Sequence, residues 1–458
     1  MVSDSESTLT SGPATISSTA APLSQKRTER ASSPGDPGDA GRPSDAKKAR
    51  PLGPSQSFAQ DLQAMAPNNS ELAGPHVHFR GNGHLDCENP LSFQLLEVQA
   101  HKSEPSSALL FGVTKTGLRL LVLVKDIGGT VKQFMEQHTI LAMCSVELPS
   151  GKYHEINEQD RLSHNQTELV IRHEDLVFHP AELPWKIADS VQLRILSFDI
   201  ETLVPTQGFS NPLHNAVLQI GNILKGNGNE SDSFRIIFTL RGCSAIAGAE
   251  VRSFQTEYDL LLAWRKFIID CDPDMVTGHN IGCFDLMYLI IRARTLEVPG
   301  FACLGRLKDH NTEIVEQHEN NGVPPGWQDA PVLPGRLQFD TLQYFKQRGQ
   351  DVGCSLGTLA ARYLGSNKES GVEYTMINRL QDGTNDDRRR LAVYCLKDCD
   401  LVLRLLFSEQ NLCFEEAVTV ARQSKSCRPF GSFLRCGIPR TYRPSLLESE
   451  QAKVDGNV

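Results

Sequence analysis

An apolar, β-branched run near the middle of the chain is interrupted by two acidic residues. The run VQLRILSFDIET, residues 191–202, predicts a strand, and it contains Asp199 and Glu201. Side chains alternate along a strand, so both carboxylates are expected on one face, with Phe198 and Ile200 on the other. Both acidic residues stand where apolar sequence is expected, which makes them candidate site residues if further acidic residues join them.

Two further acidic residues occupy predicted helices. Asp285 follows Asn280 in the segment HNIGCFD and lies at the start of the helical run 284–296. Asp398 follows Tyr394 on a long helix predicted over 388–407. Positions i and i+4 share a helix face, so the Tyr394 hydroxyl and the Asp398 carboxylate are expected to point together. The same face carries the buried-type residues Leu391, Cys395, Val402 and Leu405.

Carboxylates from one strand and two helices can converge on a pair of hard cations. Mg²⁺ and Mn²⁺ prefer oxygen ligands, and two such ions about 4 Å apart can perform in-line phosphoryl displacement. Tyr394 is placed to orient the water or the scissile phosphate. Taken singly, each motif favours a structural role, since acidic residues often end strands and Asn280 is a helix-capping residue type. Together, and in this order, they favour a site.

The surrounding sequence alternates strands with helices from residue 191 to about 410, which predicts an α/β core on a mixed sheet with flanking helices. Residues 57–190 are expected to form a small β-rich domain, with helical spacing at 57–66. Its predicted strands occupy 91–98, 108–113, 118–124, 145–153 and 167–178. Residues 306–335 form a predicted polar loop, and residues 411–458 an irregular C-terminal tail.

The first 56 residues are rich in Ser, Pro, Ala, Gly and Asp and contain no aromatic residue, so a disordered tail is expected. Two basic clusters in it favour a nuclear localisation signal, and hence the nucleus; the alternative is a solvated tail with scattered charges. The clusters are Lys26, Arg27 and Arg30, and Lys47, Lys48 and Arg50.

Net charge, cysteine spacing and hydropathy limit which kinds of DNA contact, metal site and membrane segment the chain can have. The formal net charge is −9, so any DNA contact must come from local Lys and Arg patches. The 12 cysteines show no zinc-site spacing and are expected to be free thiols in a reducing compartment. No apolar run approaches the roughly 20 residues that a membrane span requires, so no membrane partner is expected and the protein is predicted to be intracellular.

Three segments resemble the motifs of the DnaQ-like (RNase H-like) exonucleases, specifically those of family-B DNA polymerases. They are FDIE at 198–201, GHNIGCFD at 278–285 and YCLKDCD at 394–400, and the flanking sequence is similar to the delta type of that family. The resemblance implies a 3′→5′ proofreading exonuclease acting on single-stranded or frayed 3′ DNA ends beside other polymerase subunits. It implies that Tyr394 positions the attacking water and that Asn280 and Phe284 contact the 3′-terminal nucleotides. The implied ligands of two Mg²⁺ or Mn²⁺ ions are Asp199, Glu201, Asp285 and Asp398.

Three departures from that family stand out. The acidic blocks D-x-x-S-L-Y-P-S and Y-G-D-T-D-S used for polymerisation do not occur in this sequence, so the retained activity is expected to be the exonuclease. The β-rich domain is similar to the family but internally shortened. The loop 306–335 is unlike the family, and its acidic residues are expected to repel a phosphate backbone. Two alternatives therefore stay open: a non-catalytic polymerase fragment that binds DNA or polymerase partners, and an RNase H-like nuclease acting on RNA or internal sites.

Overall fold

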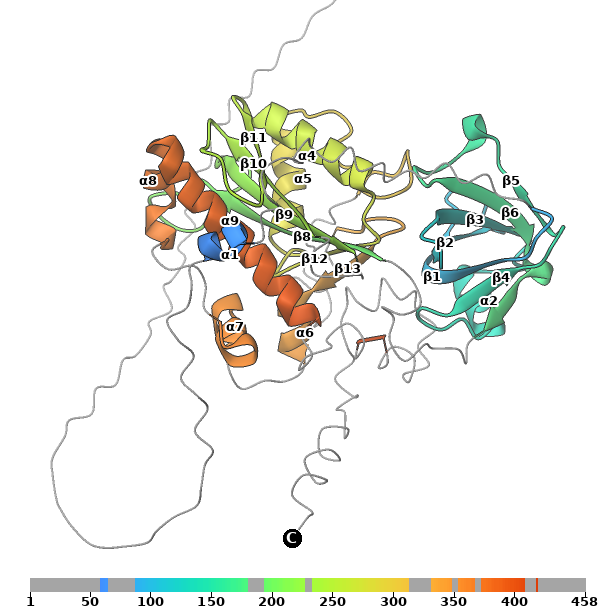
Figure 1. Ribbon diagram of the computed structural model, residues 1–458. Coiled ribbons are helices and arrows are strands. Elements are labelled where there is room, and N and C mark those ends of the chain that lie inside the picture. The colour runs from blue at the N-terminus through green and yellow to red at the C-terminus, as the bar shows by residue number, and fades with distance from the viewer. Residues whose placement is uncertain are drawn as a thin grey trace, which may run out of the picture. The chain divides into compact units, whose positions relative to one another are not determined.

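Two β-sheets organise the computed structural model (Figure 1). The structure describes residues 58–64, 87–179, 193–226, 233–312, 331–347, 353–366, 372–407 and 417–418. The predicted disordered tail, its basic clusters and most of the C-terminal tail lie outside these residues, as do Glu313, Glu316, Glu319 and Asp329 of the predicted acidic loop.

The first sheet has seven strands in the order β5-β6-β3-β2-β1-β4-β7, and all neighbours are antiparallel except β3 and β6. Its core includes Phe134 of helix α2 (Val131–Gln137), which begins with a capping box between Thr130 and Gln133. The runs predicted at 91–98, 108–113 and 118–124 each form one strand, whereas 145–153 and 167–178 are each divided between two strands; α2 was not predicted. The strands are β1 (Leu91–Ala100), β2 (Ala108–Thr114), β3 (Arg119–Lys125), β4 (Ser145–Leu148), β5 (Tyr153–Glu155), β6 (Thr167–Arg172) and β7 (Val177–His179).

The second sheet has six strands in the order β11-β10-β9-β8-β12-β13. Strand β9 is antiparallel to β8 and β10, whereas the other neighbours are parallel, so the sheet is mixed as predicted. The strands are β8 (Arg194–Thr202), β9 (Val217–Gly226), β10 (Phe234–Leu240), β11 (Glu250–Phe254), β12 (Met275–Gly278) and β13 (Leu337–Asp340).

Helices cover both faces of the second sheet, because alternate residues of its strands enter two different cores. Ile195 and Ile223 pack in the core that contains Cys395 of α9 (Asn385–Phe407). Phe198 belongs to the opposite core, with Trp264 of α4 (Glu257–Cys271) and residues of α5 (Asp285–Thr295). The other helices are α1 (Phe58–Ala64), α6 (Thr341–Gln347), α7 (Leu356–Leu364) and α8 (Ile377–Asp382). This α/β architecture is the predicted RNase H-like core.

A buried ion network joins strand β3 of the first sheet to the loops of the second. Arg119 contacts both oxygens of Asp274, at 3.3 and 2.7 Å. Arg306 bridges Asp274 at 2.7 Å and Asp272 at 2.9 Å, and Arg336 contacts Asp272 at 2.7 Å. Burial alone raises the pKa of both carboxyls, but the guanidinium groups overcome this and hold each pKa below its usual range. Buried ion pairs between arginine and aspartate side chains therefore connect the two sheets.

Candidate metal and nuclease site

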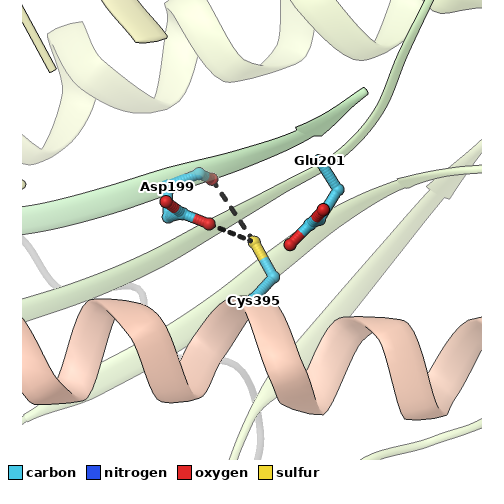
Figure 2. Close-up of side chains that lie close together, drawn as sticks. All are labelled: Asp199, Glu201 and Cys395. Carbon is cyan, nitrogen blue, oxygen red and sulfur yellow. Dashed lines mark hydrogen bonds between the residues drawn. The ribbon is translucent and has the colours of Figure 1, made fainter. Parts of the chain in front are cut away.

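Strand β8 delivers the first two predicted ligands. Asp199 is half-buried and Glu201 is 7% exposed, and both lie on the face of β8 that α9 covers (Figure 2). Phe198 and Ile200 point into the opposite core. The alternation predicted from the sequence is therefore what the structure shows, and it places two carboxylates beside the buried, mostly apolar face of α9.

Helix α9 lies unusually close to this part of the sheet. Gly221 of β9 is the register partner of Asp199, and a β-carbon built on Gly221 would lie 2.8 Å from Cys395 Sγ. Ser197 Oγ of β8 donates a hydrogen bond to the carbonyl of Cys399, at 2.9 Å. The missing side chain at Gly221 thus allows α9 to press its central turn against the acidic end of β8.

The closest grouping in the site joins Asp199, Glu201 and Cys395. One potential ligand atom of each lies within 4.8 Å of the others, the one such group of three or more His, Cys, Asp or Glu side chains among the described residues. The Cys395 thiol donates to the carbonyl and to Oδ2 of Asp199, at 3.4 and 3.6 Å (Figure 2). Burial and the neighbouring Asp199 raise the pKa of Cys395, so the sulfur is a neutral thiol and a poor partner for a hard cation.

Asp285 joins the site from the first turn of α5. Its Oδ1 accepts the backbone N–H of Ile200, at 3.1 Å, which anchors it between the two acids of β8. Burial, and then the charge of Asp199, raise the pKa of Asp285 well above its usual range. Crowded carboxylates of this kind repel one another and suit a divalent cation. The carboxylates of this site therefore fit a divalent metal ion, which prefers oxygen ligands.

The two predicted site residues of α9 lie on either side of Cys395. Asp398 is buried and Tyr394 is half-buried. Burial raises the pKa of Cys399 well above its usual range, and the charges of Asp199, Asp398 and Asp285 raise it further. These three acids therefore lie within electrostatic range of one thiol. Their shared neighbourhood is compatible with the predicted fourth ligand, while the ligand roles themselves stay a prediction.

The loop before α5 carries the two residues predicted to contact DNA. Asn280 has a left-handed backbone, with φ of 73°, and its N–H donates to Asp340 Oδ1 at 2.9 Å. Phe284 is the N-cap of α5, and its ring centroid lies 5.5 Å from that of Tyr288. Asn280 is thus not the N-cap residue of α5, and the structural alternative considered from the sequence is wrong. Both residues are half-buried.

Sequence reasoning missed two side chains that adjoin these residues. Cys395 was assigned only to the buried face of its helix, and its contact with Asp199 depends on how closely α9 approaches Gly221. Asp340 ends a strand of four residues that was not predicted. The segment GRLQFDTLQ contains a sequence signal for this strand and its acidic end, because one acidic residue follows a short apolar run. In the described residues, no helix is long and apolar enough to cross a membrane.

Comparisons with known proteins agree with this geometry. Residues 130–350 match the family model described as DNA polymerase family B, exonuclease domain. The chain is similar to the DNA polymerase delta catalytic subunit of Dictyostelium discoideum, with 45% identity over 214 residues, 46% of this chain and 19% of that protein. It is 39% identical to the DNA polymerase delta catalytic subunit of Bos taurus over 293 residues, 63% of this chain and 26% of that protein.

The matched relatives and solved structures also show how much of each protein the similarity covers. The delta catalytic subunit of Schizosaccharomyces pombe is 36% identical over 293 residues, and the chain spans 26% of its length. The chain therefore corresponds to a minor part of these curated relatives. The structure of the family B DNA polymerase from the archaeon Pyrobaculum calidifontis matches 76% of this chain and 48% of that chain, with a TM-score of 0.54 and 15% identity. That likeness shows the fold.

Proposed function

We propose that the chain is a 3′→5′ DNA exonuclease, on the premise that its residues 130–350 match the family model described as DNA polymerase family B, exonuclease domain. Its proposed substrates are single-stranded or frayed 3′ ends formed during replication and repair. The observation that carries this proposal is the crowding of Asp199, Glu201 and Asp285 at one end of β8, including a buried Asp285 whose pKa is raised by burial and by Asp199.

The proposed division of labour follows from where each residue lies. Two Mg²⁺ or Mn²⁺ ions, when bound, would activate a water and stabilise the leaving 3′ oxygen. Asp199, Glu201 and Asp285 would hold them, with Asp398 as the further ligand from α9. Tyr394, one turn before Asp398, would orient the attacking water by its hydroxyl.

The substrate would enter beside the loop that precedes α5. Asn280 is proposed to donate to the terminal nucleotide, and the half-buried ring of Phe284 to contact a 3′-terminal base. With a formal net charge of −9, the protein relies on local cationic patches and on the bound cations for its attraction to DNA. Other DNA polymerase subunits are proposed as partners and the nucleus as the location, since the relatives are named as polymerase delta catalytic subunits.

The test is degradation of a 5′-labelled single-stranded DNA oligonucleotide by purified protein, with Mg²⁺ and with chelator. We expect a metal-dependent ladder that shortens from the 3′ end. The variant Asp199→Ala/Glu201→Ala should lose it. The matched control Asp382→Ala/Asp386→Ala also removes two carboxylates, whose side chains are 69% and 70% exposed, and should keep it.

The same experiment separates the competing functions. A folded wild-type protein that binds the oligonucleotide but leaves it intact would favour the non-catalytic DNA-binding fragment. Cleavage of a closed circular DNA, or of RNA in preference to DNA, would favour a different RNase H-like nuclease. Unchanged turnover in Asp199→Ala/Glu201→Ala would overturn the assignment of the site itself.

A further inference from the structure

Asp340 holds together the loop that is proposed to receive the 3′ end. It is the last residue of β13, whose partner strand β12 ends at Gly278, directly opposite in the register. Asp340 Oδ1 accepts the N–H of Asn280 at 2.9 Å, and Oδ2 accepts the N–H of Gly282 at 3.2 Å. One carboxylate thus bonds to two backbone positions of a six-residue loop, 279–284, that leads into α5.

The same carboxylate is fixed from its own side of the sheet. Oδ1 also accepts the N–H of Leu342 at 3.0 Å, at the start of α6, and lies 3.4 Å from the nitrogen of Gln343. Burial raises the pKa of Asp340, and the backbone N–H groups oppose that rise. A half-buried carboxylate with this many backbone donors is a rigid anchor, because hydrogen bonds to a charged acceptor are stronger than neutral ones.

The loop needs such an anchor because its backbone is unfavourable on its own. Asn280 has φ of 73°, a left-handed conformation that is uncommon for non-glycine residues, although asparagine tolerates it better than most. The carbonyl of Asn280 in turn accepts the N–H of Phe284 at 2.9 Å, which closes the turn in front of α5. Thr341 adds a parallel tie, since its Oγ1 lies 3.0 Å from His279 Nδ1 and donates to the carbonyl of Gly278 at 3.0 Å.

We infer that Asp340 is a positioning residue for substrate: it holds loop 279–284 so that Asn280 and Phe284 meet the 3′-terminal nucleotides of single-stranded DNA. This inference rests on the proposed exonuclease function for its substrate class. Asp285 has its own anchor, the N–H of Ile200 at 3.1 Å. Loosening the loop should therefore weaken substrate engagement more than it disturbs the acidic site.

The test compares Asp340→Asn with wild type in KM and kcat for a single-stranded oligonucleotide. The Asn side chain keeps one acceptor but turns an N–H₂ group toward a backbone N–H, so KM should rise about tenfold with a smaller change in kcat. Asp340→Asn/Asn280→Ala should raise KM no further than the larger single change, because coupled residues are not additive. Asp387→Asn is the matched control: its carboxylate also accepts a backbone N–H, that of Thr384 at 2.9 Å, but away from the loop.

A second readout is independent of cleavage. Fluorescence anisotropy of a labelled oligonucleotide in chelator should show a dissociation constant about tenfold weaker for Asp340→Asn. If the wild-type protein binds the oligonucleotide but does not cleave it, the exonuclease proposal is refuted, and the binding measurement still tests the positioning role of Asp340. If the wild-type protein does not bind the oligonucleotide, both the exonuclease proposal and the positioning role are overturned. Equal KM and equal binding in Asp340→Asn, or additive double-variant effects, would overturn the positioning role. Should Asp340→Asn fail to fold, Thr341→Val takes its place with an expected KM rise of about threefold, and an unchanged KM there counts against the inference.

Discussion

Gly221 and Cys395 face each other so closely that a β-carbon on Gly221 would lie 2.8 Å from the sulfur and 3.2 Å from the carbonyl carbon of Cys395. The register partner of Gly221 on β8 is Asp199. The absence of a side chain at one position therefore sets how near α9, with Tyr394 and Asp398, lies to the acidic strand.

The first prediction is that Gly221→Ala displaces α9 and separates the two halves of the site. Overpacking of this kind typically costs about 1–3 kcal/mol of unfolding free energy, and we expect nuclease activity to fall by roughly 100-fold because ligand geometry is lost. Urea denaturation and the 3′-end assay measure the two effects. Gly353→Ala is the control, since among the described residues Thr358 Oγ1, at 3.9 Å, is the one atom near its β-carbon. Full activity in Gly221→Ala would show that the close approach is dispensable.

The second prediction concerns Asp285 and pH. Its folded-state pKa is raised, so the folded state binds the proton more tightly than the unfolded state, whose pKa is about 3.9. In chelator, ionised Asp285 should therefore cost stability that increases as pH rises from about 4 through the folded pKa. Asp285→Asn should be more stable than wild type at pH 8 and nearly equal to it at pH 4.

Metal should reverse that order for the wild type. Mg²⁺ binds the folded state, so it should raise the wild-type Tm, and it should leave the Tm of Asp285→Asn almost unchanged. Asp285→Asn should also lose nuclease activity. Thermal unfolding in chelator and in Mg²⁺ at both pH values checks this. If Asp285→Asn is less stable than wild type at pH 8 in chelator, the prediction that the ionised Asp285 carboxylate destabilises the folded protein is wrong.

The third prediction concerns the ion network between the two sheets. Asp274→Asn leaves Arg119 and Arg306 buried without their counter-charge and should cost about 3–5 kcal/mol of unfolding free energy. Because the folded pKa of Asp274 is lowered, its stabilising effect is present above the unfolded pKa of about 3.9 and is lost as pH falls below it. Denaturation at pH 7 and pH 3 should show the difference shrinking in acid.

A surface pair provides the comparison for that measurement. Asp270 is paired with Lys266 across one turn of α4, with side chains 54% and 73% exposed. Asp270→Asn should therefore change the unfolding free energy by at most about 0.5 kcal/mol. Equal effects of Asp270→Asn and Asp274→Asn would mean that the buried network contributes no more than an ordinary surface contact.

The fourth prediction is that Cys395 is a neighbour of the cations and not a ligand. Cys395→Ser keeps a donor beside Asp199 and should retain Mg²⁺-dependent turnover within about threefold, since Mg²⁺ prefers carboxylate oxygens to sulfur. Steady-state kinetics in Mg²⁺ measures this. A loss as large as that of Asp199→Ala/Glu201→Ala would place the sulfur in the catalytic machinery.

Sequence patterns predicted the elements that carry most of the candidate site. Alternation along 191–202 placed Asp199 and Glu201 on one face, and helical spacing placed Asp398 on the buried face of α9, because both depend on local periodicity. Strand β11 and the short β13 escaped prediction. Neither carries a strong periodic signal: β11 has no fully buried residue, and β13 spans only Leu337–Asp340. The division of the chain into domains stays a prediction.

The sequence by itself determined the α/β class, the mixed sheet and the identity of the acidic residues, since these follow from local pattern and residue chemistry. Only the tertiary structure decided that Cys395 sits against Asp199, that Asp340 anchors the loop of Asn280, and that Arg119 reaches Asp274. Each of these contacts joins residues that are 60 or more positions apart. Such pairs are set by how sheets and helices pack, which the periodicity of any single segment does not encode.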